Sequence, residues 1–382
     1  MANFNIKFDE KAATRIIGSS VTDIYVDSSQ KVIVVGTFHE VNNTPVNCIT
    51  RLNPDGSVDN SFYSPDENNY NINRVIPSVS GNGYFISGDL SYEGIKKLTY
   101  EGNIMPGFSL SLKDGAVIDI ATMQGDEYNY IIAVGTFKEA NGIPCDGVII
   151  AREDTGEIIY NLSSLLTIPA NTFVSVESVS VASNKIYIAG RFHGNDYPHI
   201  LGCFTISEVT PTYEDYAPLF SSQLQDTQAG FGLVNILAHS NGYVYAIGTA
   251  LKTGVSAYYR ALGFKAIDTT DFEVVELDYN NSPVYGVQTR KMKEAEDGYI
   301  YFAGAYEVPG VSGDEKYEAI CTKLQGTGSY LHIADLITVA KGVRNNTAPV
   351  CNVALKNEFT GNLLVGLVRQ EANDNLYKIL TI

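Results

Sequence analysis

The stretch RLNPDGSVDNSF, residues 51–62, carries the side chains whose spacing first suggests chemistry. An oxygen-bearing residue stands at every second position around a glycine: Asn53, Asp55, Ser57 and Asp59. Alternating oxygen ligands of this kind build calcium loops. At equivalent places later in the chain stand YEGN, EDTG and QGTG, where the alternating oxygens are absent. A metal site needs those oxygens and a turn does not, so the stretch predicts a hairpin turn at Asp55-Gly56 and no metal site.

Other candidate chemistry is equally sparse. His193, Asp196 and His199 could bind a transition metal, but their spacing matches no ligand motif, and a solvated loop is the default interpretation. Cys145 ends a loop after Pro144 without a predicted histidine partner. There is no G-x-S-x-G elbow and no G-x-x-x-x-G-K-[ST] phosphate loop. The 43 acidic residues allow many carboxylate pairs, so a glycan hydrolase or lyase stays an alternative. The sequence nevertheless predicts a protein that is not an enzyme and binds no cofactor.

Composition narrows the partners and the compartment. The 382 residues carry a formal net charge of −17, and the only dense basic run is Arg290, Lys291 and Lys293. Binding to nucleic acid or insertion into a membrane is therefore not expected. The N-terminus has no apolar stretch of signal-peptide length, which predicts a protein not exported by the usual route. Five cysteines without a close C-x-x-C pair predict buried, reduced thiols.

The elements that must position these residues form a repeat. Seven apolar runs close on a glycine at intervals of roughly 50 to 60 residues, a spacing typical of propeller blades; the glycines are Gly36, Gly88, Gly135, Gly190, Gly248, Gly304 and Gly366. Each unit reads as four short strands joined by turns, with the glycine run as an apolar inner strand. We expect the glycine to remove a side chain where sheets approach closely.

We therefore predict an all-β fold, a seven-bladed β-propeller of four-stranded blades in one domain, residues 1–382. The last unit supplies only three strands, and the N-terminal segment 3–8 can complete it, which would leave no open edge. The predicted blades span residues 21–62, 72–108, 117–164, 174–220, 233–279, 284–336, and 350–382 together with 3–8.

The first unit, VVGTFHEVNNTPVNCITRLNPDGSVDNSF, resembles the delta-60-type β-propeller repeat, a G-x-F turn followed by R-L-N-x-D-G-S-x-D-x-x-F. The matching residues are Gly36, Phe38, Arg51, Leu52, Asn53, Asp55, Gly56, Ser57, Asp59 and Phe62. The second unit keeps a degraded version, and several later units share little beyond the glycine strand. Repeats of this type occur in exported bacterial surface proteins and in bacteriophage proteins. The resemblance implies no catalytic motif.

Alternating strand direction would sort the loops onto two faces. The first-to-second and third-to-fourth turns are tight, whereas the other loops are long, and long loops on a rigid scaffold usually carry binding. Tyr and Asn in these long loops suit adaptable contacts to protein or carbohydrate, although the same residues also simply tolerate turns and solvent. The candidate binding residues are Asn42, Asn43, Asn68, Asn69, Tyr70, Asp196, Tyr197, Tyr258 and Tyr259.

The resemblance and the missing leader together predict a non-catalytic structural module. The leading hypothesis is a bacteriophage virion component of the tail, collar or capsid, made in the host cytoplasm and docked to other virion proteins. The alternatives are an adhesin that binds a receptor or host-surface glycan, and the glycan hydrolase or lyase.

Overall fold

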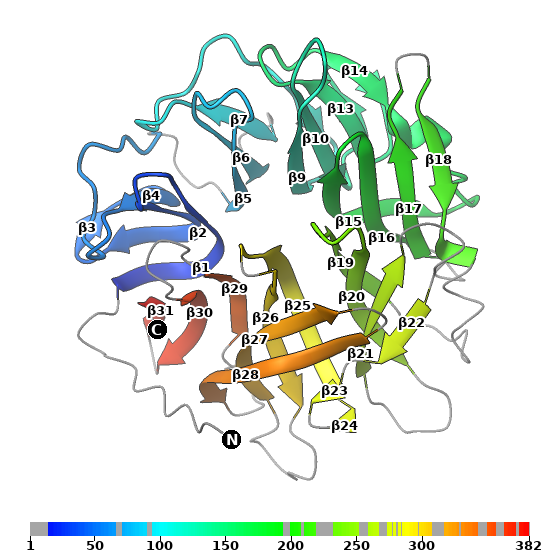
Figure 1. Cartoon of the computed structure of the whole chain (residues 1–382). Helices are drawn as coiled ribbons and strands as arrows, with labels where there is room; N and C mark the ends of the chain where they lie inside the picture. Colours follow the sequence, from blue (N-terminus) through cyan, green and yellow to red (C-terminus); the bar gives the residue numbers. More distant parts are fainter. Residues whose placement is uncertain are drawn as a thin grey trace.

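The computed structural model consists almost entirely of β-strands in the residues that it describes. These residues are 14–65, 71–89, 94–193, 199–207, 210–218, 232–251, 259–266, 273–276, 278–279, 282–283, 285–296, 298–307, 317–327, 330–342, 350–356, 363–371 and 374–381. The sheets stand around a common centre (Figure 1). Within the described part of the chain, no helix has the length and apolar character needed to cross a membrane.

The strands follow the sequence repeats, which we number 1 to 7 by their glycine strands. The strands of repeats 5 and 6 join in one ten-stranded sheet, and those of repeats 7 and 1 join in one seven-stranded sheet. Repeats 1 and 2 contain β1 (Thr14–Val26), β2 (Val32–Val41), β3 (Thr44–Pro45), β4 (Ile49–Leu52), β5 (Asn71–Pro77), β6 (Tyr84–Asp89) and β7 (Ile95–Leu98). Repeat 3, preceded by β8 (Leu112–Lys113), contains β9 (Val117–Met123), β10 (Tyr130–Gly135), β11 (Glu139–Ala140), β12 (Ile143–Pro144), β13 (Val148–Arg152), β14 (Ile158–Asn161) and the short 3-10 helix η1 (Leu162–Leu165). Repeat 4 is a four-stranded sheet of β15 (Phe173–Ala182), β16 (Lys185–His193), β17 (His199–Thr205) and β18 (Thr212–Asp215).

The remaining repeats continue around the centre. Repeat 5 contains β19 (Gly232–Ala238), β20 (Val244–Leu251), β21 (Tyr259–Ala266) and β22 (Glu273–Glu276). The short strands β23 (Asp278–Tyr279) and β24 (Ser282–Pro283) lead to repeat 6, with β25 (Tyr285–Glu294), β26 (Ile300–Glu307), β27 (Tyr317–Thr327) and β28 (Tyr330–Gly342). Repeat 7 contains β29 (Val350–Lys356), β30 (Leu363–Glu371) and β31 (Asp374–Thr381).

The recurring glycine pairs with the first strand of its own repeat at a β-bulge. Gly36 stands opposite Val21, and the next pair is Val35 with Asp23, so one residue of β1 is skipped. A side chain at Gly36 would put its Cβ 1.9 Å from the carbonyl oxygen of Ser20. The glycine is therefore required by a carbonyl of the paired strand, and not by a neighbouring sheet as the sequence suggested. The same bulge recurs, and the residue that follows it in repeats 1 to 6 is Asp23, Arg74, Asp119, Ser178, Asn235 and Lys291.

The hydrophobic cores lie between successive sheets. One cluster joins Ile132 and Val134 of β10 to Val174 and Val176 of β15, and another joins Val35 of β2 to Ile86 of β6. The second strands β2 and β10 are thus buried on both faces, as their continuous apolar sequences predict. We call each contact surface between consecutive repeats a seam.

Two details differ from the expected four-stranded units. The fourth strand is reduced to isolated bridges in repeats 1 and 2, because after the bridge of Leu52 with Val58 the chain turns at Asp59. The Ser61 amide donates to the Asp59 carboxylate at 3.0 Å, and the Phe62 amide donates to the Asp59 carbonyl at 3.0 Å.

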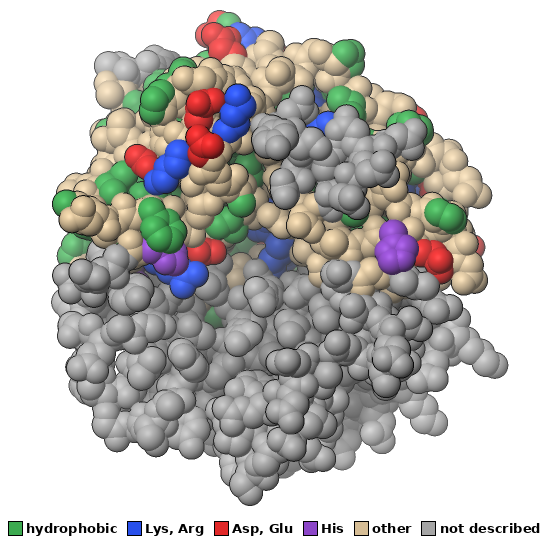
Figure 2. Space-filling view, turned by 180° about the vertical axis from the view of Figure 1, so that it is seen from behind, with side chains coloured by type: hydrophobic (Ala, Val, Ile, Leu, Met, Phe, Trp, Pro, Cys, Tyr) green, Lys and Arg blue, Asp and Glu red, His purple; other side chains and the backbone are tan. Residues whose placement is uncertain are grey.

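The second detail concerns the last unit. The segment predicted to close it, residues 3–8, lies outside the described residues. Among the described residues, β31 pairs with the start of β1, Thr14 opposite Ile379 and Ile17 opposite Leu376. The two ends of the chain thus share one sheet. The count of seven blades and their exact boundaries remain predictions. The described part of the outer surface intersperses acidic and basic side chains (Figure 2).

Candidate functional site

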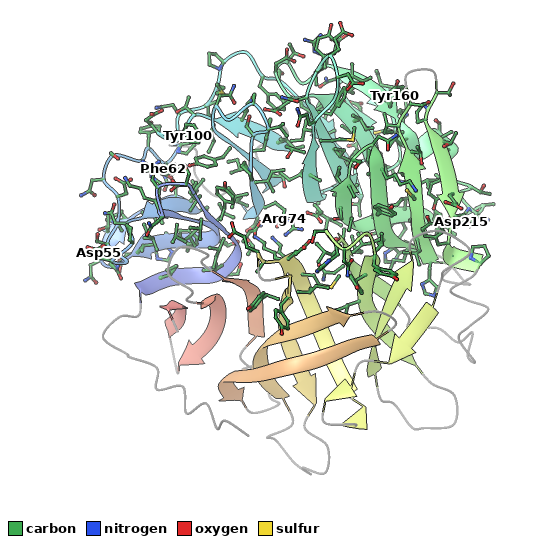
Figure 3. All side chains as sticks on the ribbon, viewed as in Figure 1. Asp55, Phe62, Arg74, Tyr100, Tyr160 and Asp215 are labelled. Carbon is green, nitrogen blue, oxygen red and sulfur yellow. The ribbon has the colours of Figure 1, made fainter. Side chains whose placement is uncertain are left out.

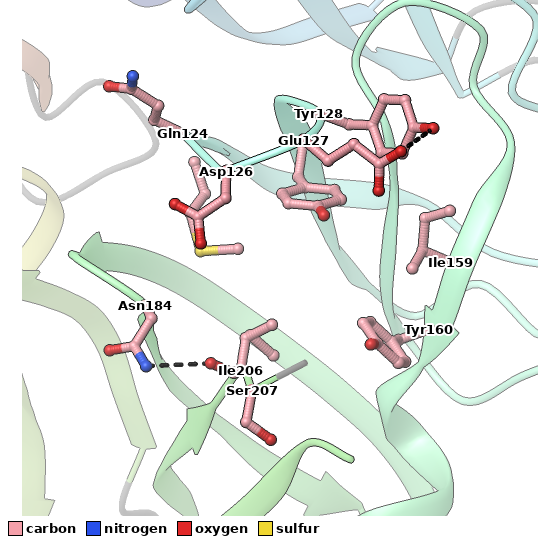
Figure 4. A pocket seen from close by; sticks show the side chains of 12 residues that line it. Gln124, Asp126, Glu127, Tyr128, Ile159, Tyr160, Asn184, Ile206 and Ser207 are labelled. Carbon is pink, nitrogen blue, oxygen red and sulfur yellow. Dashed lines mark hydrogen bonds between the residues drawn. The ribbon is translucent and has the colours of Figure 1, made fainter. Parts of the chain in front are cut away.

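A cavity of about 690 Å³ opens at the seam between repeats 3 and 4 (Figure 4). One wall is the segment 123–130, which joins β9 to β10, together with β14 of the same sheet. The other wall is the two-residue turn between β15 and β16 and the chain that leaves β17. The lining residues are Met123, Gln124, Gly125, Asp126, Glu127, Tyr128, Tyr130, Ile159, Tyr160, Asn184, Ile206 and Ser207.

Local bonds hold the repeat 3 wall in place. The Tyr128 hydroxyl donates to the Glu127 carboxylate at 2.7 Å. The Arg152 guanidinium lies 3.7 Å from the centre of the Tyr128 ring and also bonds Asp154 at 2.7 Å. Cation–π contact and ion pair together fix the plane of Tyr128. This part of the wall is therefore more ordered than a polar loop sequence would suggest.

The repeat 4 wall is low because its turn is short. The Asn184 side-chain amide donates to the Ile206 carbonyl at 3.0 Å, and the Ile206 amide donates to the Asn184 carbonyl at 2.9 Å. This reciprocal pair ties the turn to the end of β17. Met123, buried, packs into the same apolar cluster as β15 and β16 below the cavity. The cavity thus has an apolar base and a polar rim.

The rim is acidic and the tyrosines are neutral. Asp126 and Glu127 are exposed, and no Lys, Arg or His is among the described lining residues. Burial, with Tyr160, Glu127 and Asp126 nearby, raises the pKa of Tyr130. The hydrogen bond to Glu127 raises the pKa of Tyr128. Both phenols therefore stay protonated at neutral pH and serve as hydrogen-bond donors.

A second cavity, of about 620 Å³, lies beside η1 and contains Cys145 in its lining. Burial raises the pKa of the Cys145 thiol to about 11, which removes the thiolate that a reactive cysteine needs. Cys48, Cys145 and Cys203 are buried and unpaired, as the sequence predicted. The side chains of the other two cysteines lie outside the described part of the structure.

The structure describes only part of the predicted binding set. The Asn42 side chain donates to the Gly56 carbonyl at 2.9 Å, and Asn141 of repeat 3 makes the equivalent bond to Gly156 at 3.1 Å. The hairpin tips thus fold back onto the tight turns, so the predicted separation of long loops and turns onto two faces is wrong at these positions. Asn43 is exposed with φ of 64°.

The structure describes little of the other predicted binding residues. Tyr259 begins β21, and its side chain is not described. Asn68, Asn69, Tyr70, Asp196, Tyr197 and Tyr258 lie outside the described residues.

Several residues of the two candidate metal sites make other contacts where the structure describes them. Ser57 donates both its amide and its hydroxyl to Asp55, at 2.9 and 2.6 Å, and the Arg51 guanidinium donates to Asp59 at 2.7 Å. His193 stacks on Phe173 with ring centres 4.2 Å apart. The described residues contain no group of three His, Cys, Asp or Glu placed to hold a metal ion.

The sequence prediction missed the three tyrosines at the cavity between repeats 3 and 4. They come from two segments, and Figure 3 shows Tyr160 on β14, 30 positions along the chain from Tyr130 and 32 from Tyr128. The available signal was the run QGDEYNY, residues 124–130, where acidic and aromatic residues interrupt two apolar strands.

Comparison with known proteins agrees with the fold. The model of a β-propeller domain of unknown function, DUF5122, matches residues 30–62. No curated protein sequence matches the chain. A solved polysaccharide lyase, ulvan lyase, is similar with a TM-score of 0.58 and 8% identity, over 97% of this chain and 94% of that one. The same lyase bound to -[GlcA(1-4)Rha3S]- gives a TM-score of 0.57, 9% identity and the same two coverages.

A further solved structure is the periplasmic gluconolactonase of Pseudomonas aeruginosa, with a TM-score of 0.48 and 10% identity over 97% of this chain and 96% of that one. The class of protein defined by these findings is a β-propeller. The finer assignment to the delta-60 repeat remains a prediction.

The prediction that the protein is not an enzyme is contradicted, because a solved structure that it resembles along nearly its whole length is a polysaccharide lyase. That prediction took the lack of a local motif as an argument. A propeller can assemble a site from side chains of separate repeats, which share no local motif.

Proposed function

We propose that the protein binds a glycan in the cavity between repeats 3 and 4. The observation that carries the proposal is the convergence of Tyr128, Tyr130 and Tyr160 on a cavity with a polar rim. An aromatic ring offers an apolar face to the C–H face of a sugar ring, and its hydroxyl offers a hydrogen bond. Carboxylates and amides accept and donate to sugar hydroxyls.

The charges at the rim favour a neutral or amino sugar. Asp126 and Glu127 would repel a uronate or sulfate group, and the described lining holds no cation to offset them. Ulvan lyase, whose bound ligand contains both groups, supports a sugar ligand on this scaffold; the acidic rim supports a different sugar class.

We further propose that the protein is a virion component that displays this cavity and has partners on the virion or the host surface. We also propose that the fold has seven blades and is closed by the N-terminal strand. The family resemblance supports the virion setting.

Titration calorimetry tests the proposal with three probes: cello-oligosaccharides, chitosan oligosaccharides and oligogalacturonate. We expect the neutral or cationic probe to bind at least about tenfold more tightly than the acidic one. Tyr160→Ala should weaken binding about tenfold through the lost stacking, and Ser207→Trp should block the cavity. Tyr63→Ala, at a residue that is 47% exposed away from the cavity, is the matched control.

Unchanged binding in both cavity variants, or no binding to any probe, would overturn the proposal. Mass spectrometry of the same mixtures shows whether a bound glycan is also cleaved.

A further inference from the structure

The residues that follow the six bulges form a polar ring around the centre of the molecule. Asp23 of β1 accepts the Val75 amide of the next repeat at 3.1 Å, and Asp119 accepts the Val179 amide of its next repeat at 3.1 Å. Ser178 repeats the pattern by accepting the Ile236 amide at 3.2 Å. Four ring side chains thus reach the first strand of the following repeat: Asp23, Arg74, Asp119 and Ser178. Figure 3 shows Arg74 near the middle of the molecule.

Charges meet across this ring. Arg74 pairs with Asp119 and lies 3.7 Å from Asp23. Lys291 and Lys293 of β25 reach Asp23 at 3.0 and 2.9 Å, from a repeat far away in the sequence. Burial alone would raise the pKa of Asp23, but the three cations lower it, so the carboxylate is ionised.

Among the described residues, the ring together with Lys293 holds more positive than negative charge. Three cations, Arg74, Lys291 and Lys293, face the two carboxylates of Asp23 and Asp119. Buried charges need partners because they have lost their hydration. One positive charge is left over, and either Lys291 gives up its proton or an anion enters. Burial, with Arg74 as the next contribution, lowers the pKa of Lys291.

A second observation concerns Asn235. It occupies the ring position of repeat 5, is only 3% exposed, and its side-chain nitrogen has no hydrogen-bond partner among the described residues. Its strand, β19, packs against β25, the strand that carries Lys291. An unpaired buried donor beside surplus cations calls for an acceptor.

Solvent can reach this centre. The side chains of Lys293 and Arg74 keep 22% and 14% of their exposure. Figure 2 shows basic side chains in the middle of the far face. A small anion therefore has a way in, and would meet charge-assisted donors.

We propose that the ring binds one small oxyanion group, a carboxylate or a sulfate, between Arg74, Lys291 and the amide of Asn235. The site is separate from the cavity between repeats 3 and 4, and does not depend on that cavity binding a glycan. The polar groups differ as well: the ring offers cationic donors, and the cavity rim offers carboxylate acceptors.

Thermal melting and calorimetry of the full chain test the site with sodium sulfate, sodium acetate and sodium glucuronate. Sodium chloride at equal ionic strength is the reference. Because sulfate stabilises most proteins by exclusion at high concentration, the expected result is a rise in Tm that saturates at low millimolar anion, as mass action requires. Tighter binding of glucuronate than of acetate would identify the group as part of an acidic sugar, and equal binding would identify a free ion.

Asn235→Asp keeps the shape and places a negative charge at the site, so it should weaken the anion at least about tenfold. Lys293→Met, at a partly exposed position, should also weaken anion binding. This variant tests the site if Asn235→Asp does not fold. Lys138→Met, whose ion pair with Asp146 is exposed, should bind as the wild type does. The proposal is overturned if the wild type shows no saturable effect beyond chloride, or if a folded ring variant keeps the wild-type affinity.

Discussion

The seams on the two sides of repeat 3 are built alike but end differently. In each, the first-to-second-strand turn of one repeat faces the residue directly after the third strand of the next. That residue is Glu153 at the seam between repeats 2 and 3, and Ile206 at the seam between repeats 3 and 4. The first seam is sealed there, and the second holds the cavity of the candidate site.

The Glu153 carboxylate closes its seam because it accepts hydrogen bonds from several groups of repeat 2. Its carboxylate accepts the hydroxyl of Ser78, the hydroxyl of Ser80 at 2.5 Å, and the Val79 amide at 3.2 Å. Lys97 adds an ion pair at 3.3 Å with both side chains almost fully buried. The Ile206 side chain has no hydrogen-bond acceptor. The 124–129 segment therefore makes no side-chain hydrogen bond to it, and the seam stays open. The residue at this one position thus decides whether the seam is closed by contacts or holds a cavity.

The largest effect should follow from breaking the sealed seam. Glu153→Ala removes the acceptor of several donors and leaves Lys97 buried without its carboxylate. We expect a loss of about 3–5 kcal/mol in the free energy of unfolding, measured by urea denaturation. Asp154→Ala, next in sequence but exposed, should change stability by less than about 1 kcal/mol. Equal effects of the two substitutions would contradict the assigned role of Glu153.

Replacing a glycine at the same seam should have a smaller effect on stability. Gly156 and Gly142 have φ of 79° and 81°, so alanine strains both alike, by about 1 kcal/mol. A Cβ at Gly156 would lie 2.2 Å from the Ser109 carbonyl oxygen of repeat 2, whereas Gly142 faces open space. Gly156→Ala should therefore lose about 1–3 kcal/mol more than Gly142→Ala. Equal Tm values of the two variants would show that the backbone at this seam moves to make room for the added Cβ.

The smallest effect is a pH dependence. Burial alone would raise the pKa of Glu153, but hydrogen bonds from Ser78 and Ser80 lower it below its ordinary value of 4.5. The carboxylate's contribution is therefore complete above pH 4.5 and is lost as the pH falls through the folded-state pKa. Glu153→Gln should be less stable than the wild type by about 1–2 kcal/mol at neutral pH, and this gap should shrink below pH 4.5.

Urea unfolding at a series of pH values measures that gap. The exposed Glu157→Gln variant is the control. A gap that stays constant down to pH 3 would show that Glu153 does not carry the effect.

The repeat was readable from the sequence because its causes are local. A carbonyl 1.9 Å from the Cβ position at Gly36 excludes every larger residue, and burial on both faces requires an unbroken apolar strand. These constraints recur in each unit and so produce a period. The Asp55-Gly56 turn was predictable for the same reason.

The site was not readable, because it depends on which residues meet across a seam. Glu153 and its partner Ser78 are distant in the sequence, and nothing local distinguishes Glu153 from an exposed acid. The open seam follows from an isoleucine at the matching position, which looks like one more core residue. The prediction that the protein is not an enzyme failed for a related reason, since it searched for local motifs. The prediction that long loops carry binding is untested, although Asn42 folds back onto a turn.

The pairing of β31 with β1 has a consequence for the order of folding. The four paired positions, Thr14 to Ile17, lie at the opposite end of the chain from their partners. The entropic penalty of closing so long a loop grows only with the logarithm of its length, so final stability suffers little. The rate is affected more, since contacts between distant segments form late. During synthesis β1 must wait for the last strand to be translated, and its edge stays available to other chains until then.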